Sequence, residues 1–125
     1  MFSAELLRYF EHPRNAGDLP SATSRVTVTN PVCADILELF LLVEDGRIRT
    51  ARFRAKGCVP SMACAAALTE AIEGLTLTDA ALISTDSINQ LVGGVPAGSS
   101  HALQLALDAL NEALTQSARA KAVNV

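Results

Sequence analysis

Residues 36–56 constrain the fold most strongly, because they have the pattern of a β-hairpin. Residues 36–43 are apolar except for Glu38, as expected for a buried strand. The dipeptide Asp45-Gly46 is typical of a tight turn, and residues 47–56 mix basic and apolar side chains in near alternation. The basic positions change from odd to even numbers near Thr50, which predicts a β-bulge at that point.

The rest of the chain predicts one further strand and several helices. Residues 25–29 alternate apolar and polar side chains, and Asn30-Pro31 ends that strand because proline cannot donate to a ladder. Apolar residues recur at helical spacing over residues 4–10, 61–73 and the segment after Ser100. Short helical turns are expected over residues 79–83 and 87–91, beginning at Thr78 and Asp86, and weaker order is expected after Gln116.

Length and composition favour a single α+β domain over residues 1–125. A chain of 125 residues is one domain in size and can bury a core without disulfides. Half of the residues are hydrophobic, but the aromatic ones are four Phe and one Tyr, with no Trp. The core must therefore be aliphatic, which favours helices packed on one sheet over a β-sandwich.

Charge and segment lengths exclude several classes of function. The net charge of −3 argues against non-specific binding of nucleic acid. No apolar run approaches the ~18 residues that a membrane span needs, and residues 1–10 do not resemble a secretory signal. We therefore expect a cytoplasmic protein whose cysteines are thiols or ligands. Residues 47–56 carry five of the ten basic side chains, as a solvated strand face or as a docking surface for an acidic partner.

Four residues of ligand type lie at the edges of expected elements. Cys33 and Asp35 lie in the break before the second strand, Cys58 between a strand and a helix, and His101 in the first turn of the last helix. Side chains at such edges are presented to ligands, so the four could converge on one metal ion. Their spacing matches no closed zinc pattern, so on spacing alone unrelated buried thiols and a capping histidine are the default interpretation. Cys64 lies beside the apolar stripe of its helix, and we interpret it as a core thiol.

Three blocks of sequence resemble one known family. They are residues 10–17 (FEHPRNAG), 30–35 (NPVCAD) and 51–58 (ARFRAKGC). In this order they are similar to the iron–sulfur cluster assembly scaffold family of the IscU and NifU N-terminal type, and the similarity extends from about Phe2 to Leu114. The resemblance implies a three-stranded antiparallel sheet packed against helices, without enzymatic turnover.

The resemblance also implies a cofactor, a ligand set and partners. The family hosts a transient [2Fe–2S] cluster, or zinc, on three cysteines with an aspartate and sometimes a histidine nearby. Cys33 and Cys58 match the first and second cysteines, Asp35 the aspartate, and His101 the histidine before the third cysteine. The implied partners are a cysteine desulfurase, apo iron–sulfur acceptor proteins and an Hsp70-type chaperone.

The chain departs from the family at three places. Ala102 stands where the third cysteine is expected, and Ala34 replaces the glycine between the first cysteine and the aspartate. Residues 95–99 (VPAGS) replace the Pro-Pro-Val-Lys segment that contacts the chaperone. These changes affect both the cluster ligands and the chaperone contact.

Three hypotheses follow from these observations. The first is an assembly scaffold with a labile [2Fe–2S] cluster or zinc at Cys33, Asp35, Cys58 and His101, since mixed ligands hold a cluster less firmly than thiolates alone. The second is a non-enzymatic relative that has lost assembly and binds zinc or a partner, because two sulfurs, one nitrogen and one oxygen suit tetrahedral zinc. The third is a thiol enzyme with Cys58 as nucleophile and His101 as base.

Overall fold

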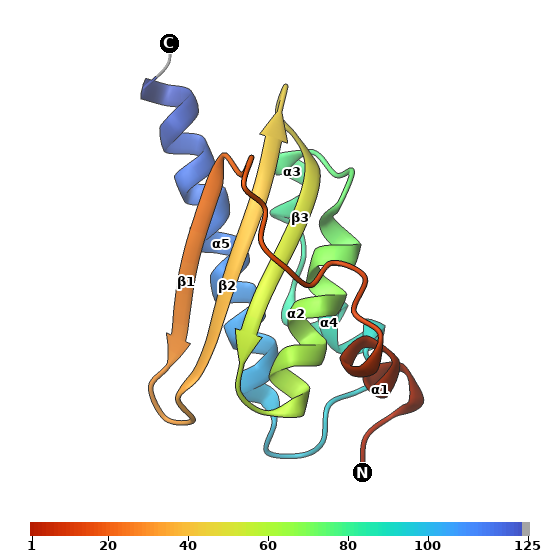
Figure 1. The fold of residues 1–125 in the computed structure, drawn as a ribbon. Coiled ribbons are helices and arrows are strands. Elements are labelled where there is room, and N and C mark those ends of the chain that lie inside the picture. Colours follow the sequence, from red (N-terminus) through yellow and green to blue (C-terminus); the bar gives the residue numbers. More distant parts are fainter. Residues whose placement is uncertain (124–125) are drawn as a thin grey trace.

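A three-stranded antiparallel sheet lies at the centre of the molecule, with the strand order β1-β2-β3 (Figure 1). The structure is a computed structural model and describes residues 1–123. The strands are β1 (Ser24–Asn30), β2 (Asp35–Glu44) and β3 (Arg47–Lys56). Helices pack on one face of this sheet, so the expected α+β fold with a three-stranded antiparallel sheet is confirmed.

The turn between β2 and β3 has the backbone conformation that its sequence predicts. Asp45 has a φ of 54° and Gly46 a φ of 73°. Two successive positive φ values give a type I′ turn, whose twist matches that of paired antiparallel strands. Asp and Gly adopt this conformation at low cost, and the predicted hairpin is confirmed.

The predicted bulge is also present in this hairpin. Leu42 pairs with Thr50 and Val43 pairs with Ile48, so Arg49 is the extra residue of β3. The bulge restores the pleat, which lets apolar residues on both sides of it face the core. The basic side chains therefore stay on the face of the sheet that points away from the core, although they occupy odd-numbered positions before the bulge and even-numbered positions after it.

Five helices complete the described part of the chain. The two longest, α2 (Val59–Ile72) and α5 (Ser100–Val123), cover the same face of the sheet (Figure 1). The shorter helices are α1 (Ala4–Glu11), α3 (Leu77–Ala80) and α4 (Thr85–Leu91). None of the five is both long enough and apolar enough to cross a membrane. α5 continues past Gln116, where we expected order to weaken, and residues 124–125 lie outside the described ones.

Burial of α2 differs from the single apolar stripe that its sequence indicates. Ten of its fourteen residues are buried, whereas Met62, which the spacing places on the stripe, is half-buried. The helix contacts β3, α1, α4 and α5. Its many alanines allow these neighbours to approach closely from several sides, and such small residues give little periodicity in the sequence.

The two short helices begin two residues earlier than predicted. Their N-caps are Thr76 and Ser84, not Thr78 and Asp86. Each cap hydroxyl accepts a hydrogen bond from the backbone N–H three residues later. Both segments offer two suitable capping residues two positions apart, and the sequence does not decide between them.

The free edge of β3 is closed by the irregular segment after α1. Phe53 N donates to Asn15 O (3.0 Å), and Gly17 N donates to Phe53 O (2.8 Å). The buried Asn15 side chain donates to Glu73 and accepts a hydrogen bond from Arg52. The block containing Asn15 therefore has a structural role, since it connects α1 to the edge of the sheet.

The basic side chains of β3 are largely neutralised by neighbouring carboxylates. Three of the five form ion pairs: Arg49 with Glu44 at 3.7 Å, Arg52 with Glu73 at 3.1 Å, and Arg54 with Glu38 at 3.3 Å. Arg52 also contacts Asn15 and is two-thirds buried, so it belongs to the framework of the fold. Of the two interpretations of this strand, the docking surface therefore loses much of its charge, and the solvated strand face fits better.

The turn between β1 and β2 contains a non-glycine residue in the left-handed region. Ala34 has a φ of 57°, and its N–H donates to Asn30 O (2.8 Å). The Asn30 side chain accepts hydrogen bonds from the N–H groups of Val32 and Cys33. These bonds hold a conformation in which the Cβ of Ala34 is sterically unfavourable.

Ala34→Gly should raise the free energy of unfolding by about 0.5–1 kcal/mol, because relief of the Cβ clash exceeds the added entropy of an unfolded glycine. The midpoint of urea denaturation at an unchanged m-value measures this gain. Ala97→Gly is the matched control, since Ala97 is also exposed in a loop but has no positive φ, and that variant should be less stable. A lower midpoint in both variants would contradict strain at Ala34.

Candidate metal centre

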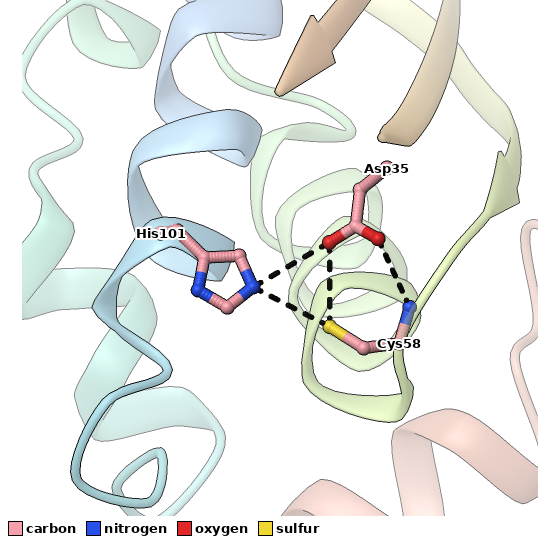
Figure 2. A group of neighbouring side chains, drawn as sticks. All are labelled: Asp35, Cys58 and His101. Carbon is pink, nitrogen blue, oxygen red and sulfur yellow. Dashed lines mark hydrogen bonds and ion pairs between the residues drawn. The ribbon is translucent and has the colours of Figure 1, made fainter. Parts of the chain in front are cut away.

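Three of the four candidate ligands meet at one end of the sheet. Asp35 is the first residue of β2, Cys58 is the N-cap of α2, and His101 lies in the first turn of α5. Figure 2 shows their side chains pointing toward one another from these three elements. The elements are far apart in sequence, so the packing of α2 and α5 on the sheet creates the site.

The donor atoms of these residues form a nearly equilateral triangle. Cys58 Sγ lies 3.3 Å from Asp35 Oδ2 and 3.6 Å from His101 Nε2. His101 Nε2 lies 3.5 Å from Asp35 Oδ2. They are also the described residues whose donor atoms group closely enough for a metal ion, all within 4.8 Å of one another.

This triangle has the dimensions of one face of a zinc tetrahedron. Zinc bonds of about 2.0–2.3 Å at tetrahedral angles place neighbouring donor atoms about 3.3–3.8 Å apart. The three measured separations, from 3.3 to 3.6 Å, lie within that range. The three donors can therefore bind one ion with little movement, and a fourth ligand position is left for another group.

Asp35 is a buried carboxylate that several donors stabilise. Its Oδ1 accepts a hydrogen bond from Cys58 N (3.2 Å), and its Oδ2 accepts one from Ser61 Oγ (2.7 Å). Burial raises the pKa of Asp35, but the hydrogen bonds from Ser61 and Cys58, with the nearby His101, outweigh it and bring the pKa below its usual value. The carboxylate is therefore ionised at neutral pH, as a metal ligand must be.

Ser61 is a site residue that sequence reasoning missed. It is 3% exposed, and its hydroxyl lies 3.2 Å from Cys58 Sγ as well as bonding Asp35. The available signal was its place three residues after the helix cap, where a hydroxyl can reach back to the cap. Serine is common at helix starts, so this signal is weak without the position of Asp35.

Gly57 makes room for the Asp35 carboxylate. It has a φ of 155°, and a Cβ built on it would lie 2.2 Å from Asp35 Oδ1. No side chain fits between these two residues while Asp35 stays in place. The glycine before Cys58 is therefore a requirement of the site as well as of the turn.

Cys33 is not a member of the donor triangle. It is exposed in the turn between β1 and β2, two residues before Asp35. We expected four ligands to converge on one point, and the described structure brings together three of them, Asp35, Cys58 and His101. The Cys33 thiol is not among the donor atoms that lie within 4.8 Å of one another, so it would have to move to join them.

Cys64 is a core thiol, as predicted. It is fully buried, and burial, with a smaller effect of the nearby Cys58, raises its pKa to about 12. Such a thiol is protonated at neutral pH, and Cys64 is not among the described residues whose donor atoms group closely enough for a metal ion. Ala102, which stands where the family has its third cysteine, is also fully buried and belongs to the hydrophobic core beside His101.

Comparison with known proteins agrees with the fold and the motifs. A family model described as the NifU-like N terminal domain matches residues 1–123. The iron-sulfur cluster assembly scaffold protein IscU 1 of Archaeoglobus fulgidus is 35% identical, over 91% of this chain and 74% of its own. The scaffold protein IscU of Haemophilus influenzae is 32% identical, over 90% of this chain and 92% of its own. The solved N-terminal part of a NifU-like protein from Brucella abortus shares the fold, with a TM-score of 0.77 at 15% identity over 91% of this chain and 92% of that one.

The fold and the matched length define a domain of the NifU N-terminal type. The chain belongs to the IscU/NifU N-terminal family, as its motifs indicated.

Gly57→Ala should lower zinc affinity by at least about tenfold, because the new methyl group displaces the Asp35 carboxylate from the donor triangle. Competition with a chromophoric chelator measures the affinity. Gly17→Ala is the control, since Gly17 also has a positive φ (133°) but a Cβ built on it would meet no atom within 4 Å. Equal zinc affinity in the two variants would show that Asp35 does not depend on Gly57.

Proposed function

We propose that this protein is a non-enzymatic scaffold of iron–sulfur cluster assembly that carries zinc or a labile [2Fe–2S] cluster. The proposed ligands are Asp35, Cys58 and His101, with Cys33 as the fourth after a change in its turn. Membership of the family and the scaffold names of the relatives support the role. The three free cysteines are consistent with action in the reducing cytoplasm.

The observation that carries the proposal is the donor triangle with sides of 3.3 to 3.6 Å. It also favours zinc as the resting metal. Each iron of a [2Fe–2S] cluster takes two protein ligands, so a cluster would require the donors to separate between two irons. Three donors that converge on one point suit a single tetrahedral ion.

One specific observation favours the second candidate, a relative that binds zinc or a partner and no longer assembles clusters. Ala102 offers no ligand at the position of the third cysteine, and its side chain is fully buried. Two thiols, Cys33 and Cys58, are then the cysteine ligands available for iron. The two candidates differ in whether a cluster forms at all.

The arrangement gives little support to a thiol enzyme. His101 Nε2 faces both Cys58 Sγ and Asp35 Oδ2. In a nucleophilic triad the carboxylate binds the other ring nitrogen and so orients the base toward the nucleophile. Here the carboxylate and the thiol both face the same ring nitrogen, so the carboxylate does not orient the histidine as a base. Donor atoms that face one another in this way are instead arranged around one point, as the ligands of one metal ion are.

The proposed partners are a cysteine desulfurase, which supplies sulfur, and apo iron–sulfur proteins, which accept the cluster. The names of the scaffold relatives support these classes of partner. Because Arg52 is part of the internal network with Glu73 and Asn15, we do not assign it to a docking surface. The replaced segment at residues 95–99 removes the motif expected for an Hsp70-type chaperone.

The purified protein should bind one zinc ion per chain, and Cys58→Ala and His101→Ala should each lower the affinity by at least about tenfold. Elemental analysis and chelator competition measure stoichiometry and affinity. Cys64→Ala is the matched cysteine control: it should cost of order 1 kcal/mol through a small cavity and leave zinc binding unchanged. Zinc binding that survives the changes at Cys58 and His101 would contradict the proposed site.

Ala102→Cys should lengthen the lifetime of a cluster reconstituted anaerobically with iron and sulfide, because it returns a thiolate at the start of a helix. The half-life of the visible absorbance under a fixed chelator concentration measures this lifetime. Ala106→Cys is the control, since Ala106 is buried four residues later on the same helix. If the unchanged protein keeps its cluster as long as the Ala102→Cys variant, loss of the third cysteine does not limit assembly. If neither forms a cluster, the second candidate is favoured.

A further inference from the structure

The two edges of the sheet differ in how their backbone groups are satisfied. The edge of β3 is closed by the segment at Asn15 and Gly17, which bonds Phe53 on both its N–H and its C=O. β1 forms the opposite edge, and no strand of the described residues lies beside it (Figure 1). An edge strand of this kind presents a row of backbone groups that can pair with another chain.

One position of the β1 edge is already occupied by a side chain that imitates a strand. Gln116 of α5 accepts a hydrogen bond from Arg25 N (2.8 Å) and donates one to Arg25 O (3.2 Å). Its amide therefore binds Arg25 as the peptide group of a neighbouring strand would. Ser24 Oγ also donates to this amide oxygen (2.7 Å), which fixes the Gln116 side chain.

The geometry of an antiparallel pair shows which other groups face outward. Backbone N–H and C=O groups point alternately toward and away from the partner strand, with a period of two residues. The outward groups of Arg25 therefore imply outward groups at Thr27 and Thr29. Both threonines are exposed, and no hydrogen bond from another described residue satisfies their outward backbone groups.

The open part of this edge borders a groove that leads to the candidate metal centre. The groove has a volume of about 250 Å³, and its lining residues are Thr29, Asn30, Pro31, His101, Gln104, Leu105 and Asp108. Its wall on α5 combines apolar Leu105 with the carboxylate of Asp108, which Gln104 contacts at 2.8 Å. Among the described residues that line the groove, Asp108 is the one carboxylate. The groove therefore favours the binding of a basic side chain over an acidic one.

We propose that the open edge of β1 at Thr27 and Thr29 binds an extended segment of a partner protein by strand addition, with a basic side chain of that segment facing Asp108. Outward backbone groups supply the hydrogen bonds, and the groove on the α5 side receives alternate side chains. The bound segment ends beside His101, so it approaches the metal centre without using a metal ligand for its backbone bonds. The surface does not depend on the proposed metal function.

A basic extended segment fits this edge better than a second copy of the same chain. Pairing of β1 with another β1 would bring together two chains of net charge −3. Strand addition by a basic segment instead gives Asp108 a partner of opposite charge. Gln116 limits the site at one end, and Asn30-Pro31 ends the ladder at the other.

The probe for this surface is the peptide acetyl-Lys-Val-Thr-Val-Lys-amide, titrated into the full chain and followed by amide NMR shifts. The expected shifts are at Thr27 and Thr29, with slower hydrogen exchange at both amides. Thr27→Pro removes one outward N–H and leaves the β1–β2 ladder intact, so it should weaken binding by roughly fivefold or more. Thr27→Val keeps that N–H and should bind the peptide as the unchanged protein does.

Two further comparisons test the same surface without relying on the stability of the proline variant. The peptide with N-methylated valines lacks donors for the edge and should not shift Thr27 or Thr29. The glutamate peptide acetyl-Glu-Val-Thr-Val-Glu-amide should bind more weakly than the lysine peptide, and Asp108→Asn should reduce this difference. Shifts confined to other residues, equal binding of the N-methylated peptide, or shifts that depend on protein concentration alone would overturn the proposal, the last in favour of a second copy.

Discussion

The carboxylate of Asp35 is the interaction on which the site depends. It lies at the start of β2, is 3% exposed, and accepts hydrogen bonds from the backbone and side chain of the first turn of α2. A buried carboxylate without such donors would be costly, and without the carboxylate Cys58 N and Ser61 Oγ would lose their acceptor. The bonds to Asp35 therefore fix where α2 begins relative to the sheet, and with it the position of Cys58.

The same constraint preorganises the donor atoms. Asp35 is held by groups that are not ligands, and α5 brings His101 to within 3.5 Å of it. Preorganisation of this kind reduces the cost of binding an ion, because little ordering remains to be done. Cys33, in the exposed turn between β1 and β2, is the one proposed ligand that these hydrogen bonds do not hold in place.

Much of the fold was predictable because its signals are local. The turn at Asp45-Gly46 and the phase change near Thr50 defined the hairpin. Four candidate ligands were expected to meet because all lie at element edges, and three of them do. The failures have physical causes: Thr76 and Ser84 compete with equally good caps two residues on, and Ser61 becomes informative when Asp35 is known to lie beside it. The position of Cys33 depends on the left-handed Ala34, which an alanine gives no reason to expect.

The close approach of Gly57 to Asp35 has a consequence for how such a sequence can diverge. Any side chain at position 57 collides with the carboxylate at 2.2 and 2.6 Å, and removal of that carboxylate relieves these two contacts but leaves the one with the Cβ of residue 35 at 2.9 Å. Substitutions at the two positions should therefore be non-additive, with a favourable coupling energy in the double variant. A side chain at position 57 is therefore less costly after Asp35 has changed than before, although the positive φ still favours glycine there. A lineage that keeps the aspartate has two independent reasons to keep the glycine, and one that loses it has a single reason.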